Sequence, residues 1–135
     1  WIMSREDTTS YPPNVFLTPE IIESYQCDGV ALIPGMFDDD DVEKLRAGIA
    51  ENLRHPGPYA AENLHTHEKG RFFDDYCNWE RIQDFADVIQ QPHVAQIAAD
   101  LMKSSTVQMF HDHVLVKEPG TAKPTPWHSD GPYYF

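Results

Sequence analysis

The spacing of the apolar residues changes near residue 105, and this change limits the folds open to the chain. Before that point apolar residues recur at helical spacing, as in Val42, Leu45 and Ile49. Over residues 106–116 apolar and polar residues alternate, which is typical of strands. The pattern predicts a single α+β domain over 1–135, with a helical section at about 18–104 and strands at about 106–135.

Local signals predict where the helices begin and end. Thr18 followed by Pro19 is typical of an N-cap and a first helical residue, and Gly29 predicts the end of that helix. The acidic run 38–41 indicates a second helix start rather than a calcium site, because the ligand spacing of a calcium loop is absent. Two further helices are predicted from about residue 79 and from Pro92.

The remaining segments are predicted as strands, loops and an N-terminal arm. Residues 1–17 read as an extended arm, 30–33 as a first strand, and 57–78 as an irregular segment. Strict alternation from residue 106 places Val107 and His113 on one face and Val114 on the other. A last strand is predicted around residue 128, after the loop that contains Pro124 and Pro126.

His128 and Asp130 form the strongest candidate metal site. On a strand, residues two apart point to the same face, so the imidazole and the carboxylate are predicted to converge on one cation. One His with one carboxylate is two thirds of the 2-His-1-carboxylate triad of non-haem iron(II) oxygenases. A short motif of this kind also arises by chance, and a structural role for the pair stays open on the residues alone.

Charge and composition narrow the classes of partner and compartment. The formal net charge of −12 disfavours binding to nucleic acid or to anionic membrane surfaces. No apolar run approaches the ~20 residues of a membrane span. Cys27 and Cys77 have no metal-type spacing and are predicted to be free thiols, which favours a cytoplasmic location.

Several segments resemble the phytanoyl-CoA dioxygenase family of Fe(II)- and 2-oxoglutarate-dependent oxygenases. They occur in the order found in that family and cover most of the chain. The segments are LTPE (17–20), Tyr25, Asp28-Gly29, IPGMF (33–37), FHDHVLVKEPG (110–120) and TPWHSD (125–130).

The resemblance implies a fold and a set of site residues. It implies N-terminal helices packed on part of a double-stranded β-helix, or jelly-roll, core that is incomplete in this chain. It also implies that His128 and Asp130 bind Fe(II), and that His113 and Arg71 lie beside the cosubstrate 2-oxoglutarate. The family's third ligand, a later His, and its Arg for the far carboxylate of 2-oxoglutarate have no counterpart in this sequence. The residues alone leave a second interpretation open for each of these two positions. His113 is then a histidine of the core, and Arg71 is a solvated cation in a loop.

By resemblance, the expected function is that of a dioxygenase that hydroxylates a small organic substrate and decarboxylates 2-oxoglutarate to succinate. No catalytic residue is expected beyond the metal ligands, and no nucleic-acid or membrane partner. The alternative is a non-catalytic fragment, or a shortened homologue, that acts as a binding module. A jelly roll needs about eight strands, whereas only about three or four are predicted here.

Overall fold

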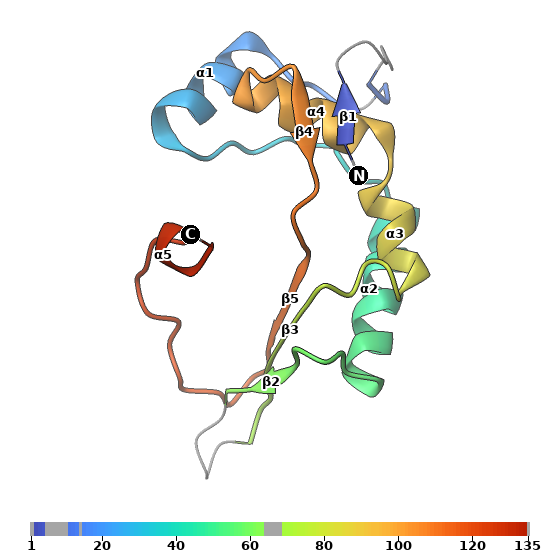
Figure 1. Ribbon diagram of the computed structural model, residues 1–135, viewed down its shortest axis with the longest axis vertical. Coiled ribbons are helices and arrows are strands. Elements are labelled where there is room, and N and C mark those ends of the chain that lie inside the picture. Colours follow the sequence, from blue (N-terminus) through green and yellow to red (C-terminus); the bar gives the residue numbers. More distant parts are fainter. Residues whose placement is uncertain (1, 5–10, 14, 64–68, 135) are drawn as a thin grey trace.

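The computed structural model describes residues 2–4, 11–13, 15–63 and 69–134. Helices dominate its first two thirds, and short strands form two antiparallel sheets, β1-β4 and β2-β3-β5 (Figure 1). The elements are β1 (Ile2–Ser4), α1 (Pro19–Asp28), α2 (Asp39–Arg54), β2 (Ala61–Glu62), β3 (Phe72–Tyr76), α3 (Gln83–Ile89), α4 (Pro92–Met102), β4 (Thr106–Gln108), β5 (His113–Lys117) and α5 (Gly131–Tyr134).

The predicted ends of α1 are confirmed by its capping contacts. The Oγ1 of Thr18 accepts a hydrogen bond from the backbone N–H of Ile21 at 3.4 Å. At the other end Gly29 adopts a left-handed conformation, with φ of 73°, and its N–H donates to the carbonyl of Tyr25. Glycine adopts this conformation without the steric cost of a Cβ, so it ends the helix here.

The acidic run at the start of α2 is a helix cap, as predicted. The carboxylate of Asp38 accepts from the N–H of Asp41 at 2.9 Å, and the carboxylate of Asp41 accepts in return from the N–H of Asp38 at 3.4 Å. Asp39 and Asp40 complete an acidic first turn at the positive end of the helix dipole.

The sheet β2-β3-β5 has one face against the helices and one face directed away from them. Phe73 pairs with Val116 across the strands, and both pack in the core that includes Phe85 of α3 and Ile49 of α2. Side chains alternate along a strand, so Phe72, Asp74 and Tyr76 point to the opposite face. Figure 1 shows α2 and α3 on one side of β3 and β5, and the chain that returns after β5 on the other.

Asp75 ties the sheet to α2 through a buried hydrogen-bond network. Its side chain is fully buried, and it accepts from the Nδ2 of Asn52 and the N–H of Gly57, both at 2.7 Å. The N–H of Tyr76 donates to its other oxygen at 2.9 Å, and Arg81 lies 3.6 Å away. Burial raises the pKa of Asp75, but the hydrogen bonds from Asn52, Gly57 and Tyr76 outweigh burial, so the pKa lies below its ordinary value of 3.8.

We expect acid to destabilise the chain through Asp75. Because its pKa is lower in the folded than in the unfolded state, its contribution to stability is present above about pH 4 and is lost as the pH falls through the folded-state pKa. Urea unfolding at several pH values should show stability declining below about pH 4 less steeply in Asp75→Ala than in the wild type. The same pH dependence in both proteins would contradict this assignment.

Five expectations about secondary structure were wrong, in whole or in part. Residues 30–33 are not a strand in the structure: they have no regular structure, and Val30 and Leu32 are 68% and 82% exposed. The segment 57–78, expected to be irregular, contains β2 and β3. The helix expected from about residue 79 begins at Gln83. The stretch 106–116 is divided into β4 and β5, and residues 121–129 contain no strand.

The α+β class is confirmed, and so is the prediction of free thiols. Cys27 and Cys77 are both free and exposed. In the residues that the structure describes, the strands form a two-stranded and a three-stranded sheet, so they do not by themselves show a jelly roll. None of the helices in this described part has the length and apolar character that a membrane span requires.

Candidate functional site

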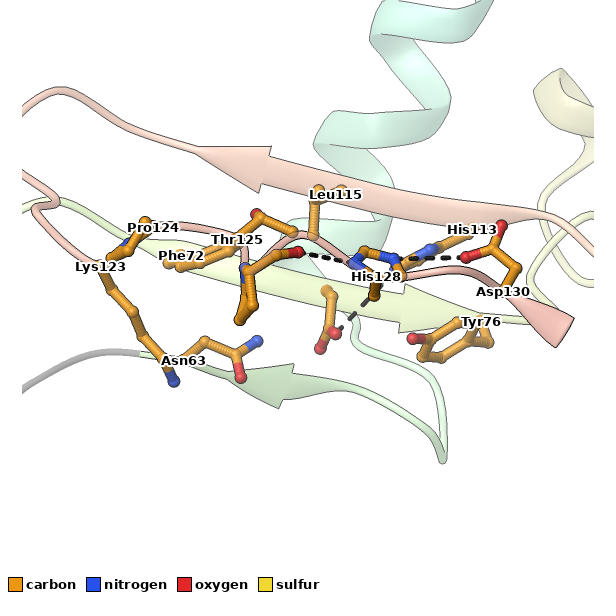
Figure 2. A pocket seen from close by; sticks show the side chains of 12 residues that line it. Asn63, Phe72, Tyr76, His113, Leu115, Lys123, Pro124, Thr125, His128 and Asp130 are labelled. Carbon is orange, nitrogen blue, oxygen red and sulfur yellow. Dashed lines mark hydrogen bonds and ion pairs between the residues drawn. The ribbon is translucent and has the colours of Figure 1, made fainter. Parts of the chain in front are cut away.

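A cavity of about 830 Å³ lies on the face of the three-stranded sheet that is directed away from α2 and α3. Figure 2 shows the side chains that line it, including His113, His128 and Asp130. The sheet supplies one wall, and the returning segment 123–130 supplies the other. The lining residues are Asn63, Phe72, Asp74, Tyr76, His113, Leu115, Lys123, Pro124, Thr125, Pro126, His128 and Asp130.

The side chains of His128 and Asp130 come together at this cavity, although not on a strand. The Nε2 of His128 lies 3.3 Å from the Oδ1 of Asp130. The strand predicted for them is wrong: His128 lies in irregular chain, and Asp130 lies in a bend directly before α5. The bend after His128, rather than a two-residue strand repeat, brings the two groups together.

A backbone contact sets the orientation and the tautomer of His128. Its Nδ1 lies 2.7 Å from the carbonyl oxygen of Pro126, and a carbonyl only accepts, so Nδ1 donates the hydrogen bond. In the neutral imidazole the lone pair is then on Nε2, the nitrogen that faces Asp130. Metal-binding histidines are commonly held in this way, by a carbonyl on the nitrogen that does not bind the metal.

The distance between the two groups fits a shared cation. Two ligand atoms each about 2.1 Å from one metal, at right-angle to tetrahedral spacing, lie about 3.0–3.4 Å apart. The 3.3 Å between Nε2 of His128 and Oδ1 of Asp130 is within that range. A lone pair and a carboxylate oxygen repel each other until a proton or a cation lies between them. The donor set therefore fits a divalent metal, with both groups on one side of it.

His113 lines the same cavity from β5. Its ring is stacked on Tyr76, with the ring centroids 4.1 Å apart, and its Nε2 is 3.9 Å from the Oδ2 of Asp74. Its predicted place beside a cosubstrate stays a prediction, and its position in the lining of the cavity is compatible with it.

Arg71 does not line this cavity. Its Nε donates to the Oε1 of Glu62 at 2.8 Å, and its guanidinium lies over the ring of Phe73, 5.0 Å from the centroid. Phe73 belongs to the helix-facing side of the sheet, so the structure does not bring Arg71 to His128. Contact between Arg71 and a cosubstrate stays a prediction, and it requires the ion pair with Glu62 to open.

The proposed metal site comprises one pair of candidate ligands, His128 and Asp130, in the described part of the chain. Within residues 2–4, 11–13, 15–63 and 69–134, no group of three or more His, Cys, Asp or Glu residues is arranged to hold a metal. The pair of His128 and Asp130 leaves the rest of a coordination sphere to be filled by other ligands. A third protein ligand remains an expectation of the family pattern.

Sequence reasoning missed several polar residues of the cavity, among them Asp74, Tyr76 and Lys123. Asp74 and Tyr76 lie on β3, which was expected to be irregular, and Lys123 precedes the proline-containing segment. The alternation of Phe72, Asp74 and Tyr76 is the signal that was available for this face. It was obscured because Phe73 and Asp75, which point the other way, are also an aromatic and an acidic residue.

Comparison with known proteins gives one match. The family model for phytanoyl-CoA dioxygenase (PhyH) matches residues 25–135, which is more than half of the chain and includes His113, His128 and Asp130. No curated protein matches the chain, and no solved structure does either. On the match over residues 25–135, the chain belongs to the phytanoyl-CoA dioxygenase family.

Proposed function

We propose that this chain acts as an Fe(II)- and 2-oxoglutarate-dependent dioxygenase that hydroxylates a small organic substrate and converts 2-oxoglutarate to succinate. Membership of the family suggests oxygenase activity of this type. The observation that carries the proposal is the convergence of His128 and Asp130 at 3.3 Å beside a cavity, with Nδ1 of His128 held by Pro126.

Each ligand has a distinct role in this proposal. Bound iron(II) with 2-oxoglutarate supplies the oxygen activation that hydroxylation needs. His128 provides a neutral nitrogen ligand, and its hydrogen bond to Pro126 limits rotation of the ring. Asp130 provides a negative ligand that offsets part of the metal charge. By resemblance to the family, a carboxylate at position 130 would take the coordination site that a halide needs, which would favour hydroxylation over halogenation.

The cavity favours a small substrate. Its volume of about 830 Å³ is within the range of small-molecule sites, roughly 300–1,000 Å³. Phe72, Tyr76, Leu115 and the two prolines of the lining present apolar surface, which excludes water from bound ligand. The formal charge of −12 disfavours a substrate that carries several phosphates, such as a CoA ester.

A binding module without catalysis is the second candidate. It is favoured by one observation: in the described residues no group of three His, Cys, Asp or Glu side chains is arranged to hold a metal. Such a module would bind iron(II) and 2-oxoglutarate in the same cavity without turning them over.

The function is tested with the full chain under anaerobic conditions. Iron(II) and 2-oxoglutarate are added together, and visible absorbance from their charge-transfer complex is expected. Oxygen is then admitted, and succinate is measured. Absorbance followed by succinate supports the dioxygenase, whereas absorbance without succinate supports the binding module. No absorbance and no succinate would overturn both.

A further inference from the structure

Asp74 presents a buried acceptor at the cavity that no protein donor satisfies. The cavity lining includes Asp74, and its side chain is 18% exposed. Its Oδ1 is buried and has no hydrogen-bond partner within the described part of the chain. Burying a carboxylate oxygen without a hydrogen-bond donor costs free energy. A cation that pairs with this carboxylate therefore gains more binding free energy than it would in water.

Oδ1 of Asp74 is covered by protein atoms, whereas the side chain as a whole is partly exposed and lines the cavity. The Nε2 of His113 lies 3.9 Å from the other oxygen, Oδ2, which is longer than a hydrogen bond. In Figure 2, Lys123 lies with Asn63 at one end of the cavity, while His113, Tyr76 and Asp130 lie at the other.

The other lining residues indicate the rest of the ligand. Phe72 precedes Asp74 and Tyr76 follows it on the same face of β3, and Leu115 is its partner across the strands. Aromatic and aliphatic walls accommodate an alkyl body, and aromatic faces also attract a cation. The formal charge of −12 raises the local concentration of cations and lowers that of anions.

We propose that Asp74 determines substrate specificity by binding the ammonium group of a small aliphatic amine in this cavity. The ammonium pairs with the carboxylate of Asp74, and the alkyl chain lies against Phe72 and Leu115. This inference rests on the proposed function, because the amine is a substrate only if the chain is an oxygenase. Binding itself needs no metal, and it is measured on the iron-free chain.

Three probes of equal length separate charge from apolar fit: pentylamine, pentan-1-ol and pentanoate. Binding to the full iron-free chain is followed by ligand-observed NMR, with affinities from titration. We expect pentylamine to bind most tightly and pentanoate least. Asp74→Asn should weaken pentylamine binding roughly tenfold and leave pentan-1-ol nearly unchanged, because the charge-assisted hydrogen bond is lost.

Asp87→Asn is the matched control. Asp87 is exposed on α3, so this variant loses the same charge as Asp74→Asn without touching the cavity. Equal pentylamine affinity in Asp74→Asn and Asp87→Asn overturns the proposal. If Asp74→Asn does not fold, the ranking of the probes on the wild type decides: pentanoate binding as tightly as pentylamine overturns it.

Failure of this inference is distinguishable from failure of the proposed function. The dioxygenase is tested by the absorbance of iron(II) with 2-oxoglutarate and by succinate, neither of which depends on an amine. A chain that forms succinate but does not prefer pentylamine retains the function and loses the substrate class. A chain that binds pentylamine through Asp74 but forms no succinate retains the amine site and loses the proposed function.

Discussion

Replacing His128 with alanine should weaken iron(II) binding by about 100-fold or more. Loss of a residue that only orients a metal ligand typically costs roughly 10–100-fold in affinity, so loss of the ligand itself should reach at least the upper value. With Nε2 gone, the carboxylate of Asp130 is what remains of the proposed pair of ligands. Anaerobic titration calorimetry with iron(II) measures the effect, and Asp130→Ala is expected to give a similar loss.

His55→Ala provides the control for this result. His55 is an exposed histidine that caps α2 and contacts Glu51, and it does not line the cavity. Its removal takes one imidazole from the chain at a place away from the cavity. The iron(II) affinity of His55→Ala should therefore be unchanged. Wild-type affinity in His128→Ala, or equal losses in the two variants, would contradict the assignment of His128.

Replacing Asp75 with alanine should lower the free energy of unfolding by about 3–5 kcal/mol. Truncating one partner of a buried charged network leaves the other groups buried and unpaired, and losses of this size are typical. Here Asn52 and the N–H of Gly57 lose their acceptor, and Arg81 loses its ion-pair partner. Because small domains are stable by only about 5–15 kcal/mol, this is a large share of the total.

Urea unfolding followed by circular dichroism measures this change. Asp87→Ala is the matched control, since its exposed carboxylate accepts from Gln83 on the same helix. A loss below about 0.5 kcal/mol is expected for the control. If Asp75→Ala lost as little free energy of unfolding as the control, the hydrogen-bond network of Asp75 would not be what holds β3 against α2. The position of Asp74 and Tyr76 at the cavity would then need another explanation.

Both ends of α1 and the starts of α2 and α4 could be predicted because their signals are local. Thr18 and Asp38 each bond to a backbone N–H three residues later, so sequence and structure carry the same information over one turn. Pro92 likewise begins α4 because its fixed φ suits a first helical residue. Such signals depend on no distant partner, and tertiary packing did not override them.

The sheet could not be predicted equally well because its pattern depends on distant contacts. Val107 and Val114 were placed on opposite faces by strict alternation, yet both are buried, because residues 109–112 interrupt the strand. Within that interruption the carboxylate of Asp112 accepts from the N–H groups of Asn78 and Trp79. This long-range contact resets the alternation, and no local pattern indicates it.

The metal pair was predicted from a geometry that the chain does not use. Pro124, Pro126 and Pro132 have no N–H to donate, so the segment around His128 is poorly suited to pairing in a sheet. The same segment supplies the carbonyl of Pro126 that orients the imidazole. His128 and Asp130 do lie close together, as the residue types predicted, although the strand that was expected to join them does not form. Their role as metal ligands stays a prediction.

Iron K-edge X-ray absorption tests most directly whether His128 and Asp130 hold one metal ion. The full chain is loaded anaerobically with iron(II), and the wild type is compared with His128→Ala and His55→Ala. We predict nitrogen and oxygen ligands at about 2.1 Å, with imidazole scattering that persists in His55→Ala and disappears in His128→Ala. Imidazole scattering of undiminished strength in His128→Ala would contradict the assignment of the iron site.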